Sequence, residues 1–168
     1  MECVIFRHDG LIEGYIGDAV LANFGFPDVG KKDVSNALFC AYDLLSAAQH
    51  WNNGRAAKGM PAINIGIGLH YGPVVLGDAG SEEYVEFTVI GDTVNIASRL
   101  QQATRALQCD LVVGRALVDA SKQEDEAAVA IDLLGRLHPH GDLAIRGRSR
   151  SVAVSTFAMP AAVTGAAP

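Results

Sequence analysis

The sequence contains no long uninterrupted apolar stretch and few cysteines. None of its apolar runs reaches the roughly 20 residues of a membrane-spanning helix, and the N-terminus lacks the basic-then-apolar pattern of a secretory signal peptide. The three cysteines, Cys3, Cys40 and Cys109, are scattered without the paired spacing of zinc ligands or of a disulfide framework. We therefore expect no membrane segment and a reducing, cytoplasmic setting.

Positive charge is scarce as well. The 168 residues carry 13 Lys and Arg against 19 Asp and Glu, a net charge of -6 at neutral pH. No basic run is long enough to follow a phosphate backbone, which argues against a nucleic-acid-binding module. An anionic ligand would therefore need a local basic cluster or a metal ion. Hydrophobic residues make up 49% of the chain, enough for one domain with a buried core.

A β-hairpin is predicted near the N-terminus. Two runs rich in β-forming residues, 11–16 and 20–24, flank Gly17 and Asp18. This pair suits a tight two-residue turn, because glycine tolerates a positive φ angle. Asp18 is therefore expected at or near the tip of the hairpin.

Two amphipathic helices follow from apolar residues at helical spacing. The first covers residues 34–48, with Asp33 as its expected N-cap. The second covers residues 91–107, with Asp92 or Thr93 as its expected N-cap. A turn-rich connector is expected between the first helix and the strand that follows it.

The expected strand at 62–72 has one apolar face and one nearly bare face. Gly66 and Gly68 lie on the bare face, which invites close approach by a helix or another backbone. Other expected elements are strands at 73–77, 84–90 and 110–114, a helix at 115–121 and a closing strand pair within 143–157, interrupted at Gly147. The order lacks a strict βαβ rhythm, so we predict an α/β sandwich with helices on one face of a mostly antiparallel sheet.

Taken singly, the polar residues of interest have ordinary structural explanations. Asp18 could be a turn residue, and Thr88 is common in strands. Asn95 and Arg99, four residues apart, could form a solvated helix edge. Arg146 and Arg148, which flank Gly147, could be edge-strand charges that discourage aggregation. Position alone decides none of these cases.

No other catalytic or metal-binding set can be assembled from the sequence. His50 and His70 have no second ligand at metal spacing, so we interpret both as structural. The glycines between 66 and 72 alternate within a strand and do not open a helix, so phosphate binding by a glycine-rich loop is not expected.

Three phrases, taken in order, resemble a known family. They are "GYIGDAVLANFG", "INIGIGLHYGPVVLGDAGSEEYVEFTVIGDTVNIASRL" and "LAIRGRSRSVAVSTF", and "FTVIGDTVNIASRL" is the most specific part. They resemble the catalytic domain of the class III nucleotide cyclases, the adenylate and guanylate cyclases. The resemblance runs from about Val4 to Phe157 and implies a ferredoxin-like α/β (α+β) sandwich. We assign residues 1–158 to this domain, in partial form, and residues 159–168 to a flexible tail.

The resemblance implies roles for the polar residues. Such enzymes convert ATP or GTP into a 3′,5′-cyclic monophosphate and pyrophosphate with two divalent ions, Mg²⁺ or Mn²⁺. Asp18 matches one of the family's two metal-binding aspartates, Asn95 the residue that orients the ribose, and Arg99 the residue that stabilises charge on the α-phosphate. Arg146 matches a basic residue, usually lysine, that holds the terminal phosphates, and Thr88 a purine-sensing position. A head-to-tail homodimer is implied, in which Asp18 acts with the other four residues of the partner chain.

The sequence departs from the family pattern in two places. The family's first metal aspartate stands in a Phe-x-Asp-Ile-x-Gly-Phe motif upstream of the hairpin, where this chain has only Glu2 and Asp9 as acidic residues. We interpret the chain as N-terminally truncated, without the first strand, and expect low or no activity from it alone. Gly14 replaces the lysine or glutamate that usually reads the purine, so base choice rests on Thr88, and we expect ATP.

Two functions remain open at this point. The first is an adenylate cyclase in cyclic nucleotide signalling, with ATP as substrate and GTP as the alternative. The second is a truncated or degenerate cyclase domain without activity of its own, kept for dimerisation or nucleotide binding. Neither involves nucleic acid.

Overall fold

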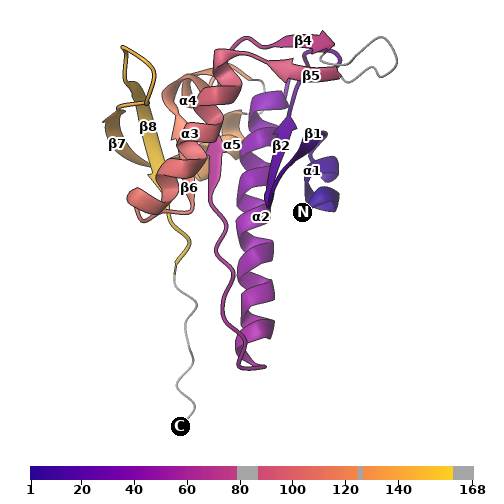
Figure 1. Cartoon of the computed structure of the whole chain (residues 1–168), viewed down its shortest axis with the longest axis vertical. Coiled ribbons are helices and arrows are strands. Elements are labelled where there is room, and N and C mark those ends of the chain that lie inside the picture. The colour runs from indigo at the N-terminus through magenta and orange to yellow at the C-terminus, as the bar shows by residue number, and fades with distance from the viewer. Residues whose placement is uncertain (79–86, 125–126, 161–168) are drawn as a thin grey trace.

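A computed structural model describes residues 1–78, 87–124 and 127–160. Helices and strands are mixed along the chain (Figure 1). Their bounds are α1 Glu2–Arg7, β1 Leu11–Ile16, β2 Ala19–Asn23, α2 Asp33–Ala56, β3 Ile67–Leu69, β4 Val75–Asp78, β5 Phe87–Ile90, α3 Asp92–Ala106, β6 Leu111–Gly114, α4 Arg115–Ser121, α5 Ala127–Gly135, β7 His138–Leu143 and β8 Val152–Phe157. The described strands form three sheets, ordered β1-β2, β3-β6-β8-β7 and β4-β5.

The N-terminal hairpin has the predicted two-residue turn. Strands β1 and β2 pair antiparallel, with Ile16 opposite Ala19. Gly17 has a φ of 65°, which glycine adopts without steric cost. Asp18 therefore lies at the tip, as the sequence predicts, and it is exposed.

Strand β6 is one of the two inner strands of the four-stranded sheet and is buried along its whole length. It pairs parallel with β3 and antiparallel with β8, which pairs antiparallel with β7. Leu111 and Val113 belong to the core cluster that contains the buried residues of α2, whereas Val112 belongs to the cluster of α3. Successive strand side chains point to opposite faces, so the two helices cover opposite faces of the sheet. The prediction that helices lie on one face was wrong in this respect.

Helix α2 is longer than predicted. It continues beyond 48 to Ala56, through a stretch that the sequence suggested was a connector. Its extension is stabilised by the chain that returns along it (Figure 1): the Asn52 side chain hydrogen-bonds with the backbone N–H and C=O of Ile63, and Arg55 donates to the Pro61 carbonyl at 2.8 Å. These long-range contacts outweigh the local turn preference.

The strand predicted at 62–72 is correspondingly short. Only Ile67–Leu69 forms strand β3, because its partner β6 begins at Leu111, opposite Ile67. Residues before Ile67 instead run beside α2 (Figure 1).

Gly66 and Gly68, the two glycines on the bare face of the predicted strand, lie where a helix packs on it, as predicted. A Cβ atom on Gly68 would overlap the backbone of α3 at Ala97 and Gln101, and one on Gly66 would overlap the Thr104 side chain. Helix α3 therefore rests directly on the β3 backbone.

The N-cap of α3 differs from the prediction. Gly91 is the N-cap, Asp92 is the first helical residue, and no side chain caps the helix. The Thr93 hydroxyl donates instead to the Pro73 carbonyl at 2.6 Å. Neither Asp92 nor Thr93 therefore caps the helix, and each side chain contacts another partner instead.

The N-terminus of α2 is bound from a distant part of the chain. The prediction of Asp33 as the N-cap was wrong: Lys32 is the N-cap and Asp33 is the first helical residue. The Asp33 carboxylate accepts a hydrogen bond from the Gly30 N–H at 2.6 Å. The Glu124 carboxylate accepts the N–H groups of Val34 and Ser35, each at 2.8 Å. Glu124 therefore satisfies donors that the helix itself leaves open.

Some elements were not predicted or cannot be compared. Helices α1 and α5 were not predicted. The closing strand pair predicted within 143–157 was only partly right, because its first strand, β7, lies earlier, at His138–Leu143. Part of the expected strand at 84–90, up to 86, and most of the expected tail, from 161, lie outside the described residues. Within the described part of the chain, no helix is long and apolar enough to cross a membrane.

Replacing Gly68 with alanine tests the contact between α3 and β3. The added methyl group meets backbone atoms that cannot rotate away, so Gly68→Ala is expected to lower the free energy of unfolding by about 3 kcal/mol in urea denaturation. Gly54→Ala is the control, because a Cβ there meets no atom within 4 Å. It is expected to stabilise the protein by about 0.5–1 kcal/mol. Equal stability of Gly68→Ala and wild type would show that α3 does not approach β3 this closely.

Candidate functional site

Helix α3 presents two of the predicted site residues on one exposed face. Ile96 and Leu100 are buried against the sheet, with 4% and 0% of their surface exposed. Asn95 and Arg99 precede them by one residue each and are exposed, one helical turn apart. Arg99 donates to the Gln102 side chain at 2.9 Å.

Arg146 lies in a tight turn between β7 and β8. The Arg148 N–H donates to the Ile145 carbonyl at 3.0 Å, and Gly147 has a φ of 87°. A positive φ at the third position of such a turn favours glycine. Ile145 is buried in the same cluster as Ile96 of α3, which sets this turn beside the helix. Arg146 is exposed at the turn.

Asn95, Arg99 and Arg146 are thus carried by two neighbouring elements of one chain. In the described part of the chain, neither the Asn95 nor the Arg146 side chain has a hydrogen bond or ion pair. The structure therefore places three of the five predicted site residues on two neighbouring elements, although no described contact joins Arg146 to Asn95 or Arg99.

An ion pair joins the same two elements at the surface. Arg148 Nη1 lies 2.7 Å from Asp92 Oδ2, in the first turn of α3. The Arg148 side chain is 31% exposed and that of Asp92 is 64% exposed. The pairing of these two residues could not be predicted, because 56 residues separate them and no local pattern connects them.

Asp18 is not brought to this group within one chain. Its hairpin packs beside α1. No described contact joins Asp18 to Asn95, Arg99 or Arg146. The carboxylate is exposed and has no partner among the described residues.

Glu13 connects this hairpin to strand β5 and was missed by sequence reasoning. It lies where the β1-β2 register shifts, and its carboxylate accepts hydrogen bonds from the Asn23 side chain and the Val89 backbone. Burial raises the pKa of Glu13, and the two hydrogen bonds partly oppose the shift. Thr88, next to Val89, pairs with Gly77 of β4, but its side chain lies outside the described residues.

The described residues do not form a metal cluster. No group of three or more His, Cys, Asp or Glu side chains comes close enough to hold an ion in the ranges that the structure covers. Asp18 is therefore a single potential oxygen ligand.

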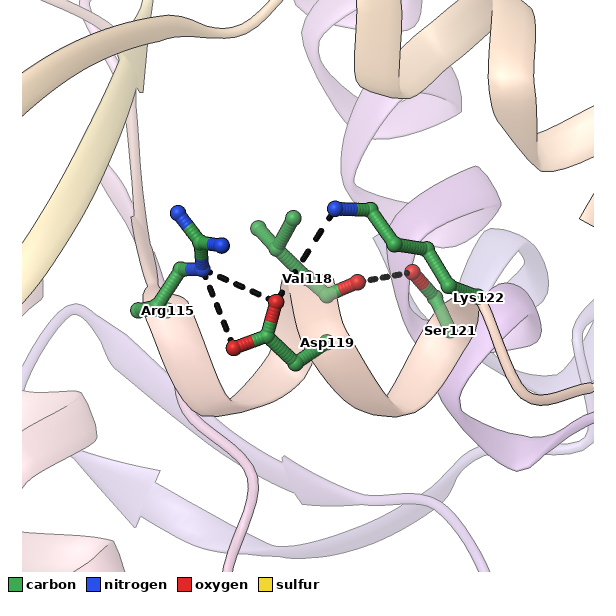
Figure 2. Close-up of polar contacts among 5 residues, drawn as sticks. All are labelled: Arg115, Val118, Asp119, Ser121 and Lys122. Atoms are coloured by element: carbon green, nitrogen blue, oxygen red, sulfur yellow. Dashed lines mark hydrogen bonds and ion pairs between the residues drawn. The ribbon is translucent and has the colours of Figure 1, made fainter.

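A cavity of about 430 Å³ lies behind the ion pair, bordered by His70, Asp92, Arg115 and Arg148. The Arg115 charge is paired within α4: its Nε lies 2.8 and 3.0 Å from the two carboxylate oxygens of Asp119, as Figure 2 shows. Arg115 is therefore not a free cation in this cavity.

His70 borders the cavity and is half buried. Its Nδ1 atom is buried against Gly114, where a Cβ atom would overlap it, and has no hydrogen-bond partner in the described structure. Burial is the main cause that lowers the pKa of His70, and the nearby Arg148 charge adds to the effect.

A comparison with protein families decides what kind of domain this is. The family model described as "Adenylate and Guanylate cyclase catalytic domain" matches residues 12–137, well over half of the chain. The chain belongs to this family. The resemblance inferred from the sequence motifs is thereby confirmed, and the match spans Asp18, Thr88, Asn95 and Arg99.

Curated relatives of this cyclase domain include two bacterial proteins. It is 38% identical over 113 residues to an adenylate cyclase of Anabaena cylindrica, covering 65% of this chain and 22% of that protein. It is 28% identical over 149 residues to adenylate cyclase 1 of Rhizobium meliloti (strain 1021), covering 89% of this chain and 21% of that protein. The chain spans about a fifth of the length of these relatives.

Solved structures confirm the fold of the cyclase domain. The guanylyl cyclase Cya2 superposes with a TM-score of 0.74 at 23% identity, over 97% of this chain and 77% of that chain. The adenylyl cyclase CyaB from P. aeruginosa superposes with a TM-score of 0.69 at 22% identity, over 95% of this chain and 76% of that chain. The α/β architecture predicted from the sequence is therefore that of class III cyclase catalytic domains.

His70 is expected to make stability depend on pH. Because its folded-state pKa lies below the ordinary value of 6.5, the unfolded chain binds a proton first as pH falls. The free energy of unfolding should therefore decline as pH drops below about 6.5 and should be unaffected by this group above it. In His70→Asn that part of the decline should disappear, measured by urea unfolding at pH 5 to 8. Identical pH profiles for both proteins would contradict the assignment.

Proposed function

We propose that this domain converts ATP into 3′,5′-cyclic AMP and pyrophosphate. The observation that carries the proposal is the grouping of Asn95, Arg99 and Arg146, which the shared burial of Ile96 and Ile145 holds on neighbouring elements. In the reaction, the ribose 3′-oxygen loses its proton and bonds to the α-phosphorus, while the bond from that phosphorus to pyrophosphate breaks.

Arg99 is proposed to stabilise the charge that develops on the α-phosphate. A guanidinium offers a forked set of N–H donors that suits phosphate oxygens, and its charge persists at any physiological pH. Asn95, one turn earlier on α3, is proposed to hold the ribose by its amide. Two groups on one rigid helical face can orient sugar and phosphate together.

Arg146 is proposed to bind the terminal phosphates. Its turn is anchored by the buried Ile145, and Gly147 allows the tight reversal that leaves Arg146 exposed. Family members usually carry lysine here, and arginine supplies the same charge with more hydrogen-bond donors.

Asp18 fits a divalent cation in ligand type but does not complete a site. A carboxylate is the donor that Mg²⁺ and Mn²⁺ prefer, and Asp18 is exposed and unpaired in the described structure. An ion bound there would withdraw charge from the phosphates. However, the described residues supply no cluster of three metal ligands, so we assign no step of the mechanism to an ion.

The choice of ATP over GTP is supported by the names of relatives and not by a base contact. The two relatives above are adenylate cyclases. Gly14 leaves open space, since a Cβ atom there meets nothing within 4 Å. Thr88 is the remaining purine-sensing residue that we propose.

We further propose that two copies form the site, with Asp18 supplied by the partner. Large apolar side chains are exposed on β1, β4 and β5: Tyr15 is 58% exposed, Ile16 71%, Val75 68% and Ile90 54%. Such residues are candidates for burial in a homodimer.

A second candidate is a cyclase domain that binds nucleotide or dimerises without turnover. It is favoured by the lack of a complete carboxylate cluster in the described part of the chain. Removing ligands from a two-metal site abolishes much of its electrostatic stabilisation while phosphate contacts to arginine remain.

Cyclisation of ATP with Mn²⁺ tests the first function. Arg99→Ala is expected to reduce cyclic AMP formation by about 100-fold or more, because it removes transition-state charge stabilisation. Asp18→Ala should reduce product as well. Arg105→Ala is the matched control, an exposed arginine near the end of the same helix, and should retain wild-type rates.

The same variants separate the two candidates. Equal product from wild type, Arg99→Ala and Asp18→Ala would contradict the proposed catalytic roles. No product from the wild type, together with ATP binding that falls in Arg99→Ala but not in Arg105→Ala, would favour the second candidate.

A further inference from the structure

The turn that carries Arg146 is fixed to α3 on two sides. On its inner side, Ile145 is buried in one cluster with Ile96 and Leu100 of α3. On its outer side, Arg148 forms the 2.7 Å ion pair with Asp92. A buried contact sets the distance between the two elements, and an ion pair between rigid points limits how the turn rotates about that contact.

We propose that Asp92 and Arg148 are positioning residues for nucleotide binding. Their ion pair holds the turn so that Arg146 faces the same ligand as Asn95 and Arg99. This inference rests on the proposed function, in which those three residues bind one nucleoside triphosphate.

The location of Asp92 suits this role. It is the first residue of α3, where a negative charge is favoured by the helix dipole. Because Gly91 is the N-cap and no side-chain cap bond forms, the Asp92 carboxylate is available to Arg148. Asn95 and Arg99 follow three and seven residues later on the same helix. An ion pair that fixes the Arg146 turn to Asp92 therefore also fixes its position relative to Asn95 and Arg99.

Because the ion pair is exposed, we expect it to fix the position of the turn and to add little to the stability of the fold. With 31% and 64% of the side chains exposed, water screens much of the attraction. Loss of the pair should therefore leave the fold intact. Its effect should be confined to the turn, whose backbone otherwise relies on one described hydrogen bond between Arg148 and Ile145.

Arg148 could instead contact a phosphate itself, and Asp92→Asn separates the two roles. If Arg148 is a direct ligand, neutralising Asp92 frees its charge and ATP binding stays equal or becomes tighter. If the pair positions Arg146, Asp92→Asn and Arg148→Gln should weaken binding to a similar extent.

The experiment measures Kd for ATP and for AMP by calorimetry, with unfolding temperature and hydrogen exchange of residues 144–151. Asp92→Asn and Arg148→Gln are each expected to weaken ATP binding by about 10-fold. Binding of AMP, which lacks the terminal phosphates, should change less than twofold. The unfolding temperature should shift by less than about 4 °C, and exchange in the turn should accelerate even without nucleotide.

The charge-reversed double variant, Asp92→Arg with Arg148→Asp, should restore ATP affinity to within about threefold of wild type if the pair acts as proposed. Asp132→Asn is the matched control. Asp132 lies on α5, and its substitution removes an exposed ion pair of the same 2.7 Å length with Arg136, the residue that follows α5; it should change neither affinity nor exchange in the turn.

Two contrary outcomes are distinguishable. Wild-type ATP binding that depends on Arg146, with unchanged affinity and unchanged exchange in Asp92→Asn, would overturn this inference alone. Absence of ATP binding by the wild type, or no effect of Arg146→Ala, would contradict the proposed function and with it the role of the pair.

Discussion

The close packing of α3 on the β3 backbone is the contact on which the site depends. It requires glycine at position 68, because any side chain there would overlap the backbone at Ala97 and Gln101. The contact places Ile96 and Leu100 in the core and leaves Asn95 and Arg99 on the exposed face. The polar residues therefore owe their direction to an apolar contact on the opposite side of their helix.

Strand β6 contacts the helices on both faces of the sheet. Its buried residues alternate between the cluster of α2 and the cluster of α3, so each face is covered by one long helix. The α3 cluster also contains Ile145, next to Arg146, and Val154 of β8. One buried cluster thus orders both the helix and the turn that we propose for nucleotide binding, and so brings elements about 50 positions apart in the sequence next to each other.

Much of the candidate site could be predicted because its chemistry is encoded locally. Asn95 and Arg99 share a face by helical spacing, and Asp18 lies at a hairpin tip because Gly17 permits the turn. The extent of α2 could not be predicted, since it depends on contacts that Asn52 makes with Ile63. The ion pair of Asp92 with Arg148 could not be predicted either, because an attraction between residues far apart in the sequence leaves no periodic pattern in it.

The sequence by itself determined the family, the N-terminal hairpin, the helix that carries Asn95 and Arg99, and the identity of the polar residues, because motif spacing and side-chain alternation are local properties. Only the tertiary structure decided which faces the helices cover, where α2 ends and which loop lies beside α3. These features depend on packing between segments far apart in the chain, where overlap at Gly68 and burial of Ile145 select one arrangement.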